Sequence, residues 1–149
     1  MRRAGTVRRA RAGDLEPLAD LLEILFSIEE DFQPDRELQI QGLGLLLKNP
    51  QAVLLVAEQD SRVIGMCSGQ LLISTAEGGP VVLVEDLVVA PGYRNKGTGS
   101  LLLENLTRWA ADRHATRLQL LADCNNTPAL DFYRKSGWQT TALICLRKK

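Results

Sequence analysis

The chain has 149 residues, of which 45% are hydrophobic and 24% charged, and its 18 basic and 18 acidic residues give a formal net charge of zero. This length suits one domain with its own core, so we expect a single domain over residues 1–149. A neutral chain has no overall field that would attract nucleic acid or a membrane surface. It contains no apolar run of about 18 residues, and no apolar signal core follows the first basic residues. We therefore expect a cytoplasmic protein that binds neither nucleic acid nor membranes.

The spacing of apolar residues divides the chain into strands and helices. The expected elements are, in order, a strand at 6–10, a helix from Asp14, a helix at 36–47, strands at 52–58, 62–73 and 81–89, a helix after residue 97, a strand at 117–122, a helix capped by Thr127 and ended by Gly137, and a strand at 138–147. This order predicts an α/β sandwich of the α+β class, with helices on both faces of a mixed sheet. We expect Arg8 and Arg9 in the first strand to be solvated.

The loop that follows the strand at 81–89 has the chemistry of an anion site. Residues 94–100 read RNKGTGS and lead directly into a helix. The first N–H groups of a helix lack partners and carry partial positive charge, and glycines let a phosphate approach the backbone. Arg94 and Lys96 add full charges. The loop therefore predicts a phosphate or pyrophosphate site, with a simple turn as the alternative, although the P-loop and dinucleotide fingerprints are both absent.

Two segments together resemble one enzyme family. Arg94-x-x-Gly97-x-Gly99, placed between a strand and a helix, resembles the acyl-coenzyme A pyrophosphate loop of the GNAT N-acetyltransferases. Residues 126–138, NTPALDFYRKSGW, are similar to the family's late N-x-x-A-x-x-F-Y-x-x-x-G-F/W pattern. The resemblance is close over residues 81–138 and extends to the element order of the whole chain. It implies a mixed, mostly antiparallel sheet with a splayed central strand pair, and an acetyl-coenzyme A-dependent N-acetyltransferase.

The resemblance also implies where the acetyl-coenzyme A cosubstrate binds. Its pantetheine would lie between the splayed strands like an additional strand, held by backbone groups that have no partner in the sheet. The cofactor-binding residues implied in this way are Leu87, Val88, Val89, Arg94, Asn95, Lys96, Gly97, Thr98, Gly99, Ser100, Asn126 and Tyr133. For Asn126, a role as a turn residue at a helix entry is the alternative.

Acetyl transfer to an amine requires a proton acceptor, because an alkylammonium with a pKa of about 10.4 is not a nucleophile. Glu85 interrupts an apolar strand, where burial would raise its pKa, and it matches a glutamate of the polyamine acetyltransferases in the family. We interpret it as the base, acting directly or through water, or alternatively as a group that orients the ammonium or makes a structural hydrogen bond. Asp86 is expected on the opposite face of the sheet unless a bulge intervenes.

Tyr133 is the candidate acid for the departing thiolate, because the family commonly places a tyrosine there near the sulfur. Simple packing of Tyr133 is the alternative.

The remaining signals concern the acceptor, metals and partners. The acidic residues Glu29, Glu30, Asp31 and Asp35 either attract a cationic acceptor or form a solvated connection. A lone His114 and three cysteines without close ligand spacing predict no metal site. We expect a homodimer that acetylates a primary amine of a small molecule by direct transfer. The alternatives are a non-catalytic acyl-coenzyme A-binding or regulatory module on the same fold, and acetylation of a protein or peptide amine.

Overall fold

The computed structural model describes residues 5–29 and 33–149, so Glu30 and Asp31 of the acidic stretch lie outside the described residues. The chain forms two compact units, Met1–Gln119 and Leu120–Lys149. The elements are β1 Thr6–Arg9, η1 Ala12–Asp14, α1 Leu15–Ile28, α2 Arg36–Lys48, β2 Ala52–Gln59, β3 Arg62–Ser74, β4 Gly79–Val89, η2 Pro91–Tyr93, α3 Thr98–Asp112, β5 Leu118–Leu120 and α4 Thr127–Lys135.

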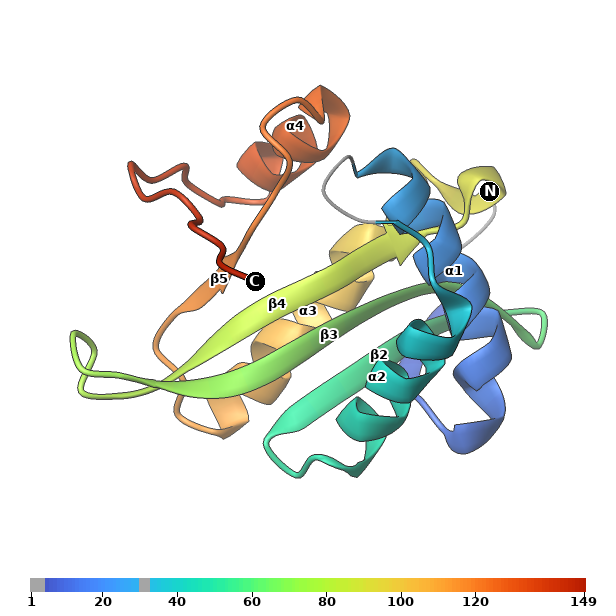
Figure 1. Cartoon of the computed structure of the whole chain (residues 1–149), viewed down its shortest axis with the longest axis horizontal. Helices are drawn as coiled ribbons and strands as arrows, with labels where there is room; N and C mark the ends of the chain where they lie inside the picture. The colour runs from blue at the N-terminus through green and yellow to red at the C-terminus, as the bar shows by residue number, and fades with distance from the viewer. Residues whose placement is uncertain (1–4, 30–32) are drawn as a thin grey trace. The chain divides into compact units, whose positions relative to one another are not determined.

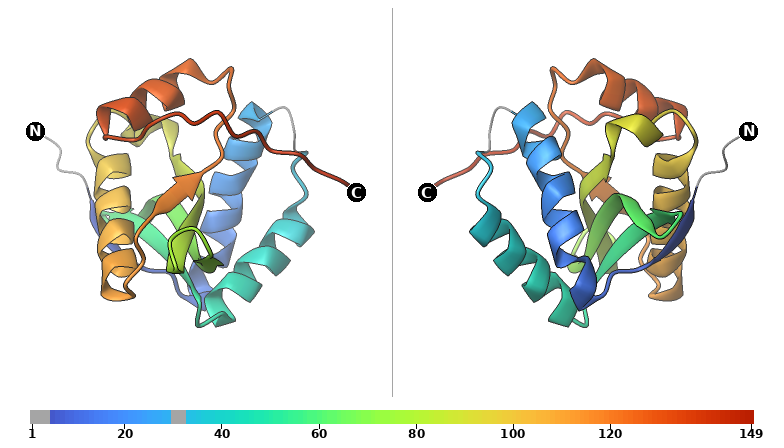
Figure 2. Two further views of the ribbon diagram at one scale, coloured as in Figure 1. Left: turned by 90° about the vertical axis from the view of Figure 1, so that its left-hand side faces the viewer. Right: turned by 90° about the vertical axis from the view of Figure 1, so that its right-hand side faces the viewer.

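The strands form one sheet in the order β1-β2-β3-β4-β5. The pairs β1/β2, β2/β3 and β3/β4 are antiparallel. The segment that enters β5 runs parallel to β4, since the Thr116 N–H donates to the Pro80 carbonyl at 3.2 Å and the Val82 N–H donates to the Arg117 carbonyl at 2.9 Å. Helices α1 and α2 cover one face of the sheet and α3 covers the other (Figures 1 and 2). The predicted fold class is therefore confirmed.

Two glycines of β3 bring α3 close to the sheet. A Cβ atom on Gly69 would lie 2.7 Å from Leu106 Cδ1, and one on Gly65 would lie 3.3 Å from Leu102 Cδ1. Both leucines are fully buried, so larger residues in β3 would overpack this interface. On the other face of the sheet, a hydrophobic cluster joins the two helices to the middle of the sheet; it contains Leu18, Leu21, Leu22, Leu43, Leu54, Val56, Met66 and Val88.

Arg8 is not a solvated charge, in contrast to the prediction. Its guanidinium donates to both carboxyl oxygens of Asp14, at 2.8 and 3.0 Å, and its Nε donates to Glu58. Asp14 is only 7% exposed and also accepts a hydrogen bond from the Arg11 N–H at 2.7 Å. The prediction failed because Glu58 is distant in sequence and comes near Arg8 only when β1 pairs with β2.

Replacing Arg8 by methionine should destabilise the protein by about 2 kcal/mol at pH 7, because a buried carboxylate loses its charged partner. The hydrogen bonds from Arg8 hold the pKa of Asp14 below its usual value. This contribution is therefore fully present above pH 4 and is lost as the pH falls through the pKa of the folded state. Urea unfolding of Arg8→Met and of the exposed control Arg9→Met should differ at pH 7 and converge in acid. Equal effects of the two substitutions at pH 7 would contradict this account.

Helix α4 of the second unit is capped one residue earlier than the sequence predicted. Asn126, rather than Thr127, is the N-cap residue, and its side-chain oxygen accepts the Ala129 N–H at 3.3 Å. The predicted end at Gly137 is confirmed by its φ of +91°. The Trp138 N–H donates to the Tyr133 carbonyl at 2.9 Å. This hydrogen bond is typical of an α-helix that ends at a glycine in the left-handed conformation.

The predicted strand at 138–147 is wrong, because no strand or helix is formed in this segment. Leu143, Ile144 and Leu146 are each at least 80% exposed. An apolar pattern can indicate a strand, but a strand also needs a neighbour for its backbone hydrogen bonds.

Candidate active site

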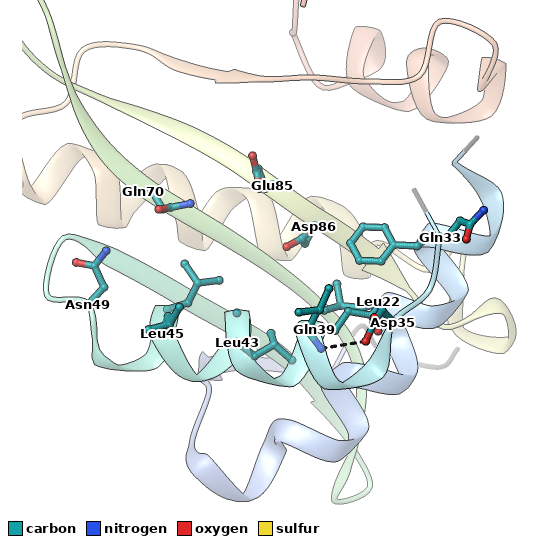
Figure 3. Close-up of a pocket in the computed structure, with 14 residues that line it drawn as sticks. Leu22, Gln33, Asp35, Gln39, Leu43, Leu45, Asn49, Gln70, Glu85 and Asp86 are labelled. Atoms are coloured by element: carbon teal, nitrogen blue, oxygen red, sulfur yellow. Dashed lines mark hydrogen bonds between the residues drawn. The ribbon is translucent and has the colours of Figure 1, made fainter. Parts of the chain in front are cut away.

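A cavity of about 470 Å³ lies among α1, α2, β3 and β4, all within the first unit (Figure 3). Most of its apolar wall comes from leucines of α1 and α2. Its polar lining residues are Asp35, Glu85 and Asp86, which carry carboxyl groups, and Gln33, Gln39, Asn49 and Gln70, which carry amides. None of the described lining residues is lysine, arginine or histidine. The cavity is therefore apolar in body, acidic on its charged side, and suited to a cation.

The pairing of β4 with β3 contains a bulge at the cavity. Ser68 stands opposite Glu85 and Met66 stands opposite Val88. Two residues of β4, Asp86 and Leu87, therefore lie opposite the single β3 residue Cys67. A bulge of this kind places one additional residue in one strand and changes the face to which the following side chains point. Consistently, Val88 belongs to the core cluster beneath the α1–α2 face, three residues after cavity-lining Glu85. Regular alternation would place these two side chains on opposite faces.

Asp86 is the residue that the bulge redirects. Its φ of +56° is in the left-handed region, which aspartate tolerates better than most residues. Both Asp86 and Glu85 line the cavity, and in Figure 3 the Asp86 carboxyl lies on the α2 side of β4 while that of Glu85 points away from α2. The expected alternation carried an exception for a bulge, and the bulge found here lets both residues line one cavity.

Burial separates the two neighbouring carboxyl groups. Glu85 is exposed, whereas Asp86 is half-buried. Burial, and then the charges of Glu85 and Glu29, raise the pKa of Asp86 to about 7. A carboxyl group with a raised pKa thus stands next to the predicted residue Glu85.

The predicted anion loop joins β4 to α3 in the first unit. Gly97 is the N-cap residue of α3 with a φ of +85°, and it provides no side-chain cap for the helix. The first intrahelical bond runs from the Leu101 N–H to the Gly97 carbonyl at 3.0 Å, so the N–H groups of Thr98, Gly99 and Ser100 have no partner within the helix. These N–H groups and the absence of a Cβ at Gly97 and Gly99 fit a pyrophosphate.

Two cationic side chains extend from this loop. Arg94 is exposed and its Nε donates to the Val89 carbonyl at 2.9 Å, while Lys96 is exposed and donates to the Gly92 carbonyl at 3.1 Å. Asn95 adopts a φ of +61° between them. The structure thus brings the predicted residues 94–100 together at the start of one helix.

The other predicted site residues have local roles in the structure. Asn126 caps α4, which is the alternative interpretation of this residue. The Tyr133 ring packs edge-on against Phe132 and Trp138, with ring centroids 5.4 and 5.8 Å apart. Asp35 lines the cavity and also caps α2 by accepting the Leu38 N–H at 3.2 Å. The roles of Asn126 and Tyr133 towards a cofactor stay predictions.

Within residues 5–29 and 33–149, no three or more His, Cys, Asp or Glu side chains are grouped as a metal ion would require. Over the same residues, no helix has the length and apolar character needed to cross a membrane.

Comparison with known proteins identifies the family. The Acetyltransferase (GNAT) family profile matches residues 15–138. The chain is 27% identical to "Uncharacterized N-acetyltransferase YhfO" of Bacillus subtilis (strain 168) over 137 residues, which are 89% of each chain. It is 25% identical to "Aminoglycoside N(6')-acetyltransferase type 1" of Acinetobacter haemolyticus over 130 residues, which are 85% of this chain and 88% of the relative.

A solved structure shares the fold. "Aminoglycoside N-Acetyltransferase AAC(6')-Iy in Complex with CoA" has a TM-score of 0.84 at 18% identity, over 97% of this chain and 93% of that one. Three observations point to the same family: the order of strands and helices, the loop at the start of α3 and the profile match. The chain belongs to the acetyltransferase (GNAT) family and is an N-acetyltransferase that uses acetyl-coenzyme A as its cosubstrate.

Proposed function

We propose that this protein transfers the acetyl group directly to a primary amine of a small molecule that binds in the cavity between α2 and β4. The observation that carries the proposal is the pair of neighbouring carboxyl groups, Glu85 and Asp86, which line one cavity that has no basic residue in its described lining. The volume of about 470 Å³ lies within the usual range of about 300–1,000 Å³ for small-molecule sites. One relative is named as an aminoglycoside N(6')-acetyltransferase, and an aminoglycoside is a small molecule with amino groups. This relative supports the proposed acceptor class.

The chemistry assigns each part of the site a task. An acidic cavity binds the acceptor as an ammonium, and one carboxylate must remove its proton before the nitrogen attacks. The N–H groups at the start of α3 hold the pyrophosphate of acetyl-coenzyme A, which supplies the thioester. In this proposal Tyr133 protonates the departing thiolate, Asn126 contacts the pantetheine, and backbone groups of Leu87, Val88 and Val89 align it.

The cavity wall supports an acceptor with an apolar body. Leu38 and Leu45 both line the cavity and are 63% and 64% exposed, so most of their apolar surface is open to a bound molecule. The amides of Gln70 and Asn49 offer hydrogen bonds to a neutral polar group on the same molecule. An acceptor with several positive charges stays a prediction from the acidic stretch, of which the described residue Asp35 lines the cavity.

Thiol release from acetyl-coenzyme A in the presence of an amine panel tests this function. The panel should contain aliphatic monoamines, polyamines, aminoglycosides, lysine analogues and a lysine peptide. We expect turnover with small amines and a loss of kcat/KM at high salt, because an acidic cavity attracts cations through a screened field. Turnover with the peptide alone, or coenzyme A binding without turnover of any amine, would contradict the proposal.

A cytoplasmic homodimer also stays a prediction, which cell fractionation and size-exclusion chromatography test.

The placement of the pyrophosphate makes a separate prediction. Gly99→Val should weaken acetyl-coenzyme A binding by about 10- to 100-fold, because side-chain bulk keeps phosphate oxygens away from the N–H groups at the start of α3. Isothermal titration calorimetry measures this change. Gly92→Val is the control, since a Cβ at Gly92 has no atom within 4 Å. Gly97→Val is less informative, because its positive φ would strain any side chain. Equal affinities of the Gly99 and Gly92 variants would contradict this placement.

A further inference from the structure

The bulge in β4 separates two carboxyl groups that are neighbours in the sequence. We propose that Asp86, which the bulge turns into the cavity, accepts the proton of the acceptor ammonium, while the neighbouring Glu85 attracts the ammonium by its charge. This inference rests on the proposed function, since it assigns the proton transfer within that reaction. It moves the base from the residue that the sequence predicted to its neighbour.

The surroundings of the two groups favour this division of roles. Two neighbouring carboxylates in one cavity repel each other, so a proton taken up by the pair resides on the member that is less solvated. Asp86 is half-buried and Glu85 is exposed. Burial is also the main reason that the pKa of Asp86 is raised to about 7. A base with a pKa near the working pH both accepts a proton and releases it again, which is the condition for efficient general base catalysis.

The other titratable groups near Asp86 are acidic or carry no charge at neutral pH. Glu29, at the end of α1, raises the pKa of Asp86 as Glu85 does, and Asp35, at the start of α2, lines the same cavity. Cys67 of β3 lies opposite the bulge of β4. Its thiol is buried, which raises its pKa to about 12, so it carries no charge at neutral pH. The described lining of the cavity contains no basic residue. The ammonium of the acceptor is therefore the cation that the site is built to receive.

The proposed step conserves atoms and charge. The ammonium transfers one proton to the Asp86 carboxylate, which gives a neutral amine and a carboxylic acid. The amine nitrogen then forms a bond to the thioester carbonyl carbon, and the carbon–sulfur bond breaks. The second nitrogen proton goes to the departing thiolate through the acid of the site, and Asp86 releases its proton to water. The sum is amide, thiol and one proton.

The matched variants Asp86→Asn and Glu85→Gln test this assignment. Each removes one carboxylate at nearly constant shape, and asparagine also tolerates the left-handed backbone at position 86. We expect wild type to show an acidic limb of kcat/KM near pH 7. Asp86→Asn should abolish this limb and lower kcat by about 10²- to 10⁴-fold, as removal of a general base does. Glu85→Gln should raise KM, retain more of kcat than Asp86→Asn does, and move that limb to lower pH, because one of the charges that raise the pKa of Asp86 is gone.

Nuclear magnetic resonance titration of ¹³C-labelled aspartate carboxyl groups provides a readout that does not depend on turnover. One carboxyl group should titrate near pH 7 in wild type, be absent in Asp86→Asn, and shift to lower pH in Glu85→Gln. Wild-type turnover together with near-wild-type kcat in Asp86→Asn and a large loss in Glu85→Gln overturns the assignment and returns the base to Glu85. Absence of a carboxyl titration near pH 7 overturns it as well. Failure of wild type to acetylate any amine overturns the proposed function, and this assignment with it.

Discussion

Asp86→Asn is expected to make the protein more stable at pH 8, by at most about 4 kcal/mol, because a pKa raised from about 3.8 to about 7 costs about 1.4 kcal/mol per unit when the group is ionised. Burial is the first cause of this raised pKa, so the penalty belongs to the folded state. Well below the unfolded-state pKa of 3.8, aspartate is protonated in both the folded and the unfolded chain and the penalty vanishes. Wild type should therefore lose stability, relative to the variant, as the pH rises from about 4 to about 7.

Urea unfolding at several pH values between 4 and 8 measures this difference. Glu85→Gln is the matched comparison, because it removes one of the charges that raise the pKa of Asp86 and should relieve only part of the penalty. A difference between Asp86→Asn and wild type that stays constant from pH 4 to pH 8 would show that Asp86 is ionised without penalty in the folded state. A gain in stability combined with a loss of kcat in the same variant would be the expected behaviour of a buried group retained for chemistry.

Tyr133→Phe is expected to lower kcat by about 10²-fold, the usual contribution of a general acid, if the hydroxyl protonates the departing thiolate. The substitution keeps the aromatic ring, and thus the edge-on packing against Phe132 and Trp138 at 5.4 and 5.8 Å. Stability and the affinity for acetyl-coenzyme A should therefore remain close to those of wild type.

Steady-state kinetics over a range of pH separate this role from packing. The chain contains a second tyrosine, Tyr93, whose ring lies beneath the Lys96 ammonium at 5.9 Å. Tyr93→Phe makes the same chemical change and should leave kcat close to wild type. If Tyr133→Phe has the kcat of wild type and keeps the alkaline limb of its pH profile, Tyr133 serves for packing and another group protonates the thiolate.

The sequence alone determined most of the elements and the character of the loop before α3. Apolar spacing predicted both strands of the β2–β3 hairpin and the helices α1, α2 and α3, because the period of a helix or strand is a local property of the chain. RNKGTGS predicted the open N–H groups at the start of α3, where a phosphate could approach the glycine backbone closely. The family was also evident from the sequence, because its two signatures are local strings.

The tertiary structure decided which side chains meet. The sequence of a strand shows which side chains alternate between the two faces of the sheet, but this alternation changes at a bulge. A bulge lies at Asp86, and both Asp86 and Glu85 line one cavity. Arg8 found Glu58 only through the pairing of β1 with β2. Burial likewise depends on what packs around a residue, and in the folded chain it is the first cause of the raised pKa of Asp86. Contacts between residues far apart in the chain follow from packing, which no local pattern encodes.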